Sequence, residues 1–350
     1  MIINLDAKNY GGLGDIIFQS WVAGGVRATG GECSFFTKNT EKRMLLSMLS
    51  QPLSEVSEGA IDCTKPYDLE CREHGKKMRH QYMLDHIGRA GVCLVKPLVR
   101  IPEEDMCWAR EFIDKHKRKG TVLLFPQTCW ATRLWPTTYW IDLAWELWNR
   151  GILAPLMVNN SPETYRRSPM YCNRLPLERV AALMKLSDAV VGNDSFPIHL
   201  SSTIGTRTIG LFGPTKPEVV MGYNPDPCLR VIQSDLRCTG CHWQSPIFRG
   251  SCDIQCQSLM ALTPERVMQV LDELGCSGKL PSGSNSILDW VYPAKSVDLP
   301  DKTESWQSST HRLSSTSFTQ PEPISWLARL RSMKSVTGKL NFWTSRKSTD

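Results

Sequence analysis

The segment from residue 190 to 217, VVGNDSFPIHLSSTIGTRTIGLFGPTKP, constrains the fold more than any other part of the chain. An apolar run ends at Gly192, residues 193–195 then offer a helix N-cap, and Pro197 stands near the first helical position. A second apolar run and a Gly-Pro turn follow. The pattern predicts strand, turn, helix and strand, with unpaired N–H groups of the helix beyond the strand's carboxyl edge.

Open α/β sheets bind nucleotide phosphates at such helix N-termini, because the N–H groups and the positive end of the helix dipole face the anion. An ordinary βαβ unit has the same spacing without binding a phosphate. The segment by itself therefore leaves a phosphate site and a plain structural unit as open alternatives.

Strand and helix signals alternate along the whole chain. Strands are predicted at residues 2–5, 34–36, 122–125, 153–158 and 189–191, and helices at 15–29, 39–50, 103–118, 139–150 and 177–185. Strands that alternate with helices of ten or more residues indicate the α/β class, with parallel, doubly wound sheets and ligand sites at the strand ends.

Composition excludes several other classes of protein. The 350 residues are 41% hydrophobic, which is enough for two domains that each have a core. No apolar run reaches membrane-spanning length, and Asp6 and Lys8 stand where a signal peptide would need an apolar block. We therefore expect the chain to stay in the cytoplasm. The net charge of +6 is mild for this length and indicates no specific reading of nucleic acid.

Four separated motifs resemble, in the same order, those of glycosyltransferase family 9, the heptosyltransferase family. They are GGLGDII at 11–17, WATRLWP at 130–136, DSFPIHL and LFGPTKP within 194–217, and four cysteines within 238–256 that precede LTPERV. Arg133 stands where the family usually has Lys. The resemblance covers about residues 1–276 and is weak between about residues 30 and 117.

This resemblance implies the GT-B fold, in which two Rossmann-like doubly wound domains face a cleft. Residues 1–117 would form the N-terminal, acceptor-side domain. Residues 118–276 would form the C-terminal domain, which binds the nucleotide-sugar and carries the cysteine cluster. The N-terminal half is short for such a domain, so we expect a reduced acceptor side.

The remaining residues, 277–350, have a different character. Residues 301–320 contain ten Ser or Thr with few apolar anchors, and we expect the whole segment 277–350 to be a disordered tail. The final thirty residues are basic, with aromatic side chains between the charges. That end is either a solvated tail or a segment that contacts anionic lipid at the inner face of the membrane.

Asp15 is the candidate for the chemistry of transfer. It follows Gly12 and Gly14 where the chain should leave the first strand and enter a helix. Sugar transfer to a hydroxyl needs a base within hydrogen-bond reach, and a positioned carboxylate can serve. A helix cap is the structural alternative for an Asp at this place. The resemblance implies that Asp15 is the general base.

The donor side needs groups that stabilise the charge of a departing nucleoside diphosphate. Arg133 can donate two parallel N–H groups, and Thr128 or Thr132 can add hydroxyl donors. Ser195 at the predicted helix N-terminus and Lys216 in the following turn would add an N–H group and a second cation. The alternatives are a surface charge for Arg133 and a solvated loop residue for Lys216.

The resemblance also places Gly14, Asp194, His199 and Gly213 beside the nucleotide-sugar, although a histidine inside a helix is more often a packing residue. Phe196 departs from the family, which usually has Gly after Asp-Ser. Its ring either packs under the helix or reshapes the sugar pocket and changes the choice of donor.

Cys238, Cys241, Cys252 and Cys256 form two closely spaced pairs with ten residues between them. Two thiol pairs across a loop suit a tetrahedral metal site, for which zinc fits the chemistry, and four reduced thiols are the alternative. The cluster resembles that of some bacterial autotransporter heptosyltransferases, which hold iron in a four-cysteine finger. The resemblance implies a structural role for a metal here, because GT-B transferases need no metal at the reacting centre.

The sequence thus predicts an inverting glycosyltransferase that moves a sugar from a nucleotide-diphosphate donor to a hydroxyl of a glycan or lipopolysaccharide-type acceptor. ADP-heptose is the candidate donor that the resemblance implies. The alternative is a catalytically inactive protein that binds a nucleotide-sugar or a glycan. Asp15 and Arg133 favour the enzyme, whereas Phe196 and the short N-terminal half favour the alternative.

Overall fold

The computed structural model describes residues 1–4, 12–62, 64–160, 162–224, 227–243 and 255–275, together with the backbone of residues 291–294. Cys252 and almost all of the segment predicted to be a tail lie outside these ranges. No helix in the described part of the chain is long and apolar enough to cross a membrane.

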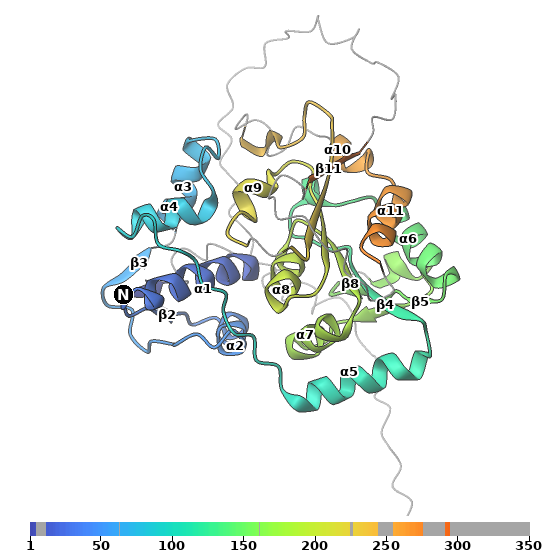
Figure 1. Ribbon diagram of the computed structural model, residues 1–350, viewed down its shortest axis with the longest axis horizontal. Coiled ribbons are helices and arrows are strands. Elements are labelled where there is room, and N and C mark those ends of the chain that lie inside the picture. The colour runs from blue at the N-terminus through green and yellow to red at the C-terminus, as the bar shows by residue number, and fades with distance from the viewer. Residues whose placement is uncertain are drawn as a thin grey trace, which may run out of the picture. The chain divides into compact units, whose positions relative to one another are not determined.

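The N-terminal part of the chain contains a small parallel sheet (Figure 1). Within the described residues it has three strands, in the order β2 (Ser34–Phe36), β1 (Ile2–Asn4) and β3 (Ala60–Asp62). Its helices are α1 (Leu13–Ala28), α2 (Thr40–Met48), α3 (Thr64–Arg72) and α4 (Arg79–His86). The central strand is short and apolar, and Ile3 at its middle pairs with Phe35 and is 1% exposed.

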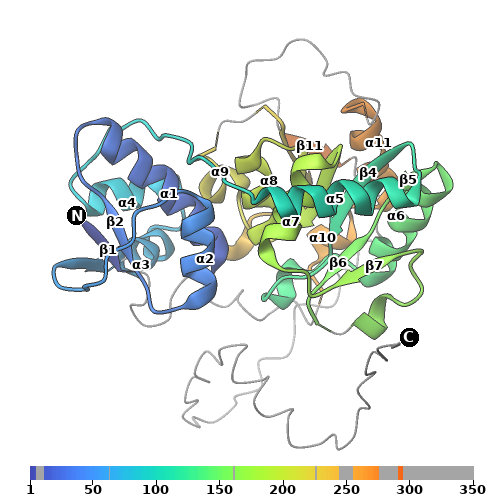
Figure 2. The ribbon, with the colours of Figure 1, turned by 90° about the horizontal axis from the view of Figure 1, so that it is seen from below.

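The second sheet is larger and is also parallel (Figure 2). Its strand order among the described residues is β11-β10-β9-β8-β4-β6-β7, and β5 pairs with β4. The strands are β4 (Gly120–Phe125), β5 (Ile152–Leu153), β6 (Leu156–Val158), β7 (Tyr171–Asn173), β8 (Ala189–Asn193), β9 (Thr208–Leu211), β10 (Leu229–Ser234) and β11 (Val291–Ala294).

Helices cover both faces of this sheet, which explains why its strands are continuous apolar runs rather than alternating ones. In β4, Val122 and Leu124 pack into the core that holds α6 (Thr137–Asn149) and α11 (Pro264–Glu273). The intervening Leu123 packs into the core of the opposite face. That face carries α7 (Leu177–Leu186) and α8 (Phe196–Ile204), and α5 (Glu103–His116) packs on α7.

The α/β class with parallel sheets is confirmed, and the strands and helices predicted from the sequence lie where we expected them, with one change. The strand predicted at 153–158 is divided into β5 and β6 around Pro155. Strand β11 lies beside β10 and within the segment for which we expected no packed structure. The predicted boundary between residues 117 and 118 stays a prediction.

Candidate active site

The carboxyl ends of β4, β8 and β9 form one edge of the larger sheet. These strands are adjacent and parallel, with Phe125 paired to Gly192 and Asn193 paired to Leu211. The chain leaves β4 toward Thr128, Thr132 and Arg133, leaves β8 into Asp194 and Ser195, and leaves β9 toward Gly213 and Lys216. The structure therefore brings together all the donor-side residues that follow these three strands.

Asn193 joins the first two of these loops. Its side chain is fully buried, Oδ1 accepts the backbone N–H of Trp135 at 3.1 Å, and Nδ2 donates to the carbonyl of Pro126 at 2.9 Å. The sequence predicts Asn193 only as part of a helix N-cap. Instead, this amide fixes the loop that carries Arg133 against the end of β8.

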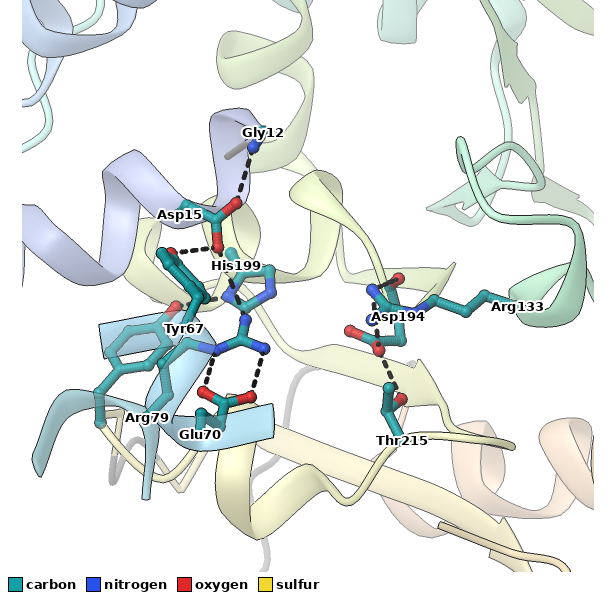
Figure 3. A network of polar contacts seen from close by, with 10 residues as sticks. Gly12, Asp15, Tyr67, Glu70, Arg79, Arg133, Asp194, His199 and Thr215 are labelled. Atoms are coloured by element: carbon teal, nitrogen blue, oxygen red, sulfur yellow. Dashed lines mark hydrogen bonds and ion pairs between the residues drawn. The ribbon is translucent and has the colours of Figure 1, made fainter. Parts of the chain in front are cut away.

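Arg133 and Asp194 form a mostly buried ion pair (Figure 3). Nη1 of Arg133 lies 3.2 Å from Oδ2 of Asp194, whose side chain is only 3% exposed, and the same Oδ2 accepts the hydroxyl of Thr215 at 2.5 Å. The guanidinium also stacks 4.0 Å from the ring centroid of Trp130. These contacts fix Arg133 in one place and neutralise a carboxylate that would otherwise repel a phosphate.

The other terminal nitrogen of Arg133, Nη2, makes no hydrogen bond within the described ranges, and Nε is buried without a partner there. The sequence predicted two parallel N–H groups for the diphosphate. In the structure Nη1 is engaged by Asp194, so Nη2 is the donor that remains for a ligand.

Ser195 is the N-cap residue of α8, as predicted. Its hydroxyl donates to the carbonyl of Gln127 at 3.4 Å and does not cap the helix. Pro197 has no N–H, and Ile198 donates its N–H to the carbonyl of Ser195 at 3.2 Å. The backbone donors at this helix start that can bind an anion are therefore the N–H groups of Ser195 and Phe196. Phe196 is half-buried and packs against the core. This placement fits the alternative in which its ring packs under the helix and does not reshape the sugar pocket.

The remaining donor-side residues differ in how they are placed. Thr128 accepts the N–H of Trp130 at 3.5 Å, and Thr132 is half-buried. Lys216 lies along Gly240, and within the described part of the chain its ammonium forms no ion pair. At the buried Gly213, a Cβ atom would come within 2.6 Å of Leu259, so packing alone already requires glycine.

Asp15 lies in the first turn of α1, at the third helical position rather than at the N-cap. Its Oδ2 accepts the N–H of the N-cap residue Gly12 at 2.6 Å. Its Oδ1 accepts the hydroxyl of Tyr67 at 2.6 Å and lies 3.5 Å from Nη1 of Arg79 (Figure 3). The side chain is 21% exposed. Asp15 therefore contributes to a helix cap and is also fixed by two side chains from α3 and α4.

Arg79 is in turn held by Glu70, which is 3% exposed. Nε and Nη2 of the guanidinium donate to the two carboxylate oxygens at 2.9 and 3.0 Å. Burial alone would lower the pKa of Arg79, but Glu70, with smaller contributions from Tyr67 and Asp15, raises it above its ordinary value. Sequence reasoning missed these residues because they lie where the family resemblance is weak, and their spacing carries no motif.

His199 lies between the two networks. It is 6% exposed, Nδ1 is 2.7 Å from the hydroxyl of Tyr223, and the two rings are stacked at 5.8 Å. Its ring also meets Gly14, where a Cβ atom would be 3.1 Å from Cδ2. Burial lowers the pKa of His199 to about 4. At neutral pH it is therefore an uncharged packing residue of the site and not a cation for phosphate.

This environment predicts a dependence of stability on pH. The pKa of His199 is lowered from 6.5 to about 4 in the folded chain, so between these values only the unfolded chain takes up the proton. Lowering the pH from 7 to 5 should therefore reduce the free energy of unfolding through His199 by about 2 kcal/mol. An NMR titration of the imidazole measures the pKa of His199 in the folded protein. A transition centred near pH 6.5 would contradict the lowered pKa and the loss of stability that follows from it.

Comparison with known proteins finds a family whose model covers the donor side of this site. Residues 94–244 match the glycosyltransferase family 9 (heptosyltransferase) family. The resemblance to glycosyltransferase family 9 that the sequence motifs indicate is therefore confirmed. The matched region contains the loops after β4, β8 and β9, and it does not include Asp15 or Arg79.

Individual relatives agree with this assignment. Lipopolysaccharide heptosyltransferase 1 of Pseudomonas aeruginosa is 29% identical over 122 residues, which are 33% of this chain and 34% of that protein. The sequence match thus spans about a third of the length of this curated relative.

Solved structures extend the likeness over most of the chain. Escherichia coli ADP-heptose LPS heptosyltransferase II has a TM-score of 0.51 at 16% identity, over 78% of this chain and 97% of that chain. The iron-containing dodecameric glycosyltransferase TibC from enterotoxigenic E. coli has a TM-score of 0.54 at 14% identity, over 79% of this chain and 78% of that chain. At these identities the likeness concerns the fold, and it confirms the expected GT-B class.

Proposed function

We propose that this protein is an inverting glycosyltransferase that transfers a sugar from a nucleotide-diphosphate donor to a hydroxyl group of a glycan or lipopolysaccharide-type acceptor. The observation that carries this proposal is the placement of a carboxylate and a phosphate-type site around one residue. The ring of His199, on α8, packs against Gly14, the residue before Asp15, and the same helix begins just after Asp194, whose carboxylate is paired with Arg133.

The proposed step needs one base and one anion site. Asp15 removes the proton of the acceptor hydroxyl while the oxygen of that hydroxyl bonds to the anomeric carbon of the donor sugar. The bond from that carbon to the diphosphate oxygen breaks, and the electron pair leaves with the nucleoside diphosphate. Nη2 of Arg133 and the backbone N–H groups of Ser195 and Phe196 stabilise that charge. Attack opposite the leaving group inverts the anomeric configuration.

ADP-heptose is the first donor to test, because the structurally similar E. coli protein is an ADP-heptose LPS heptosyltransferase. Purified protein is incubated with a panel of nucleotide-sugars and acceptors, and released nucleoside diphosphate is measured. We expect one donor to stand out and the product to have the inverted configuration by NMR. Retained configuration would contradict the mechanism, and no release with any donor would contradict the enzymatic proposal.

An inactive protein that binds a nucleotide-sugar is the second candidate function. The observation that favours it is the small N-terminal sheet, which has three strands within the described residues. Calorimetric binding of a nucleotide-sugar without turnover would select this candidate.

A structural metal at the four cysteines remains part of the proposal. Cys241 and Cys256 are each 3% exposed and lie at the turn formed by Gly213 and Pro214. The residues on both sides of Cys241 donate their backbone N–H groups to the carbonyls of that turn. The described residues alone contain no group of three or more metal-binding side chains, and Cys252 lies outside them. A bound ion would tie this turn to the segment before α10 (Gln257–Met260).

Chelation should therefore lower the melting temperature of the protein, because metal binding to thiolates is coupled to folding. Cys241→Ser should have the same effect, whereas Cys107→Ser, at an exposed cysteine on α5, is the matched control. Elemental analysis of protein prepared without chelators decides the question. Less than about a tenth of an equivalent of zinc plus iron per chain, with melting unaffected by chelator, would show four free thiols.

A further inference from the structure

The carboxylate of Asp15 is held differently at its two oxygens (Figure 3). Oδ1 accepts the Tyr67 hydroxyl at 2.6 Å and faces Nη1 of Arg79 at 3.5 Å. Among the described residues, Oδ2 accepts only the N–H of Gly12, at 2.6 Å. Each carboxylate oxygen offers about two acceptor positions. Oδ1 thus has one hydrogen bond and one ion-pair contact, whereas Oδ2 has a single hydrogen bond and one acceptor position left.

The two side chains that engage Oδ1 are themselves fixed. The Tyr67 ring is 7% exposed and packs edge-on against Phe18, with ring centroids 6.1 Å apart. Arg79 donates to both oxygens of Glu70, so its guanidinium cannot turn without losing one of these bonds. The contacts join α1, α3 and α4 around one carboxylate.

We propose that Tyr67 and Arg79, the latter held by Glu70, are positioning residues that orient Asp15 and leave Oδ2 as the atom that takes the acceptor proton. This inference rests on the proposed function, because it assigns an atom to the base of that reaction. A base that is displaced by about 1 Å can lose about 10²-fold in rate. The geometry around Oδ1 therefore bears directly on the rate of transfer and much less on donor binding.

Tyr67→Phe tests this assignment, and Tyr82→Phe is the matched control. Tyr82 is fully buried on the neighbouring helix α4, and its hydroxyl accepts the N–H of Lys77 at 3.1 Å without touching Asp15. Both variants lose one hydroxyl group from the same region. We expect kcat to fall about 10- to 100-fold in Tyr67→Phe, with an unchanged KM for the donor, and to stay at the wild-type value in Tyr82→Phe.

Arg79 is tested with the double variant Arg79→Met with Glu70→Gln, which avoids leaving the buried Glu70 charge without a partner. The kcat of this double variant should fall by a similar factor. The single variant Arg79→Lys, which keeps the positive charge beside Glu70 and Asp15, should lose less of the wild-type kcat. Equal kcat values for wild type, Tyr67→Phe and Tyr82→Phe would overturn the positioning role while leaving the proposed function intact. Wild-type protein without turnover, or with the same rate as Asp15→Asn, would overturn the proposed function and this inference with it.

Discussion

Asp15→Asn should reduce sugar transfer by about 10²- to 10⁴-fold while the affinity for the donor changes little. The amide keeps the size of the side chain and can still accept the Tyr67 hydroxyl, but it cannot take a proton from the acceptor. Transfer is measured as product formed per enzyme, and donor affinity by calorimetry.

The matched control is Asp85→Asn, which removes a carboxylate from α4 that is 39% exposed and paired with Lys77. This change should leave transfer at the wild-type rate. A small loss of stability in Asp15→Asn is expected, because the amide cannot satisfy the Gly12 N–H on one side and Tyr67 on the other. Transfer by Asp15→Asn at the wild-type rate would show that Asp15 serves only the helix cap.

Arg133→Ala should weaken binding of the nucleotide-sugar and of the free nucleoside diphosphate by similar factors, about 10- to 100-fold. Two effects add: Nη2 is lost as a donor to the phosphate, and the buried charge of Asp194 is no longer neutralised. Calorimetry with both ligands measures the two affinities, and Arg150→Ala, at an exposed ion pair on the outside of the domain, is the control.

The double variant Arg133→Ala with Asp194→Asn separates these effects. If Arg133 contacts the diphosphate, binding stays weak in the double variant. Full recovery of affinity would mean that Arg133 serves only to neutralise Asp194. Unchanged affinity in the single variant would remove Arg133 from the site altogether.

Much of the fold follows from local patterns in the sequence. The run TVLLF predicts β4 because a strand that is buried on both faces needs continuous apolar residues. The start of α8 follows from Ser195 and Pro197, and its end from Gly205, which adopts a φ of 93° that favours glycine. Strand β3 is three residues of intermediate exposure, and such a short segment gives too weak a period to be recognised.

The candidate site also contains some residues that could be predicted from the sequence and others that could not. Asp194 could be predicted because it comes directly after β8, and parallel strands bring their carboxyl ends to one edge. Arg133 could be predicted because it lies in the motif WATRLWP. Tyr67, Glu70 and Arg79 could not, because their role depends on how α3 and α4 pack against α1. The pairing of Arg133 with Asp194 also depends on the tertiary structure, since 61 residues separate the two.

The most direct measurement is a crystal structure of Asp15→Asn with an intact nucleotide-sugar, because this variant should bind the donor without transferring it. We expect the diphosphate at the N-terminus of α8, within hydrogen-bond distance of Arg133 Nη2, and the anomeric carbon on the side that faces residue 15. A diphosphate bound away from the ends of β4, β8 and β9, or an anomeric carbon directed away from residue 15, would contradict the proposed site.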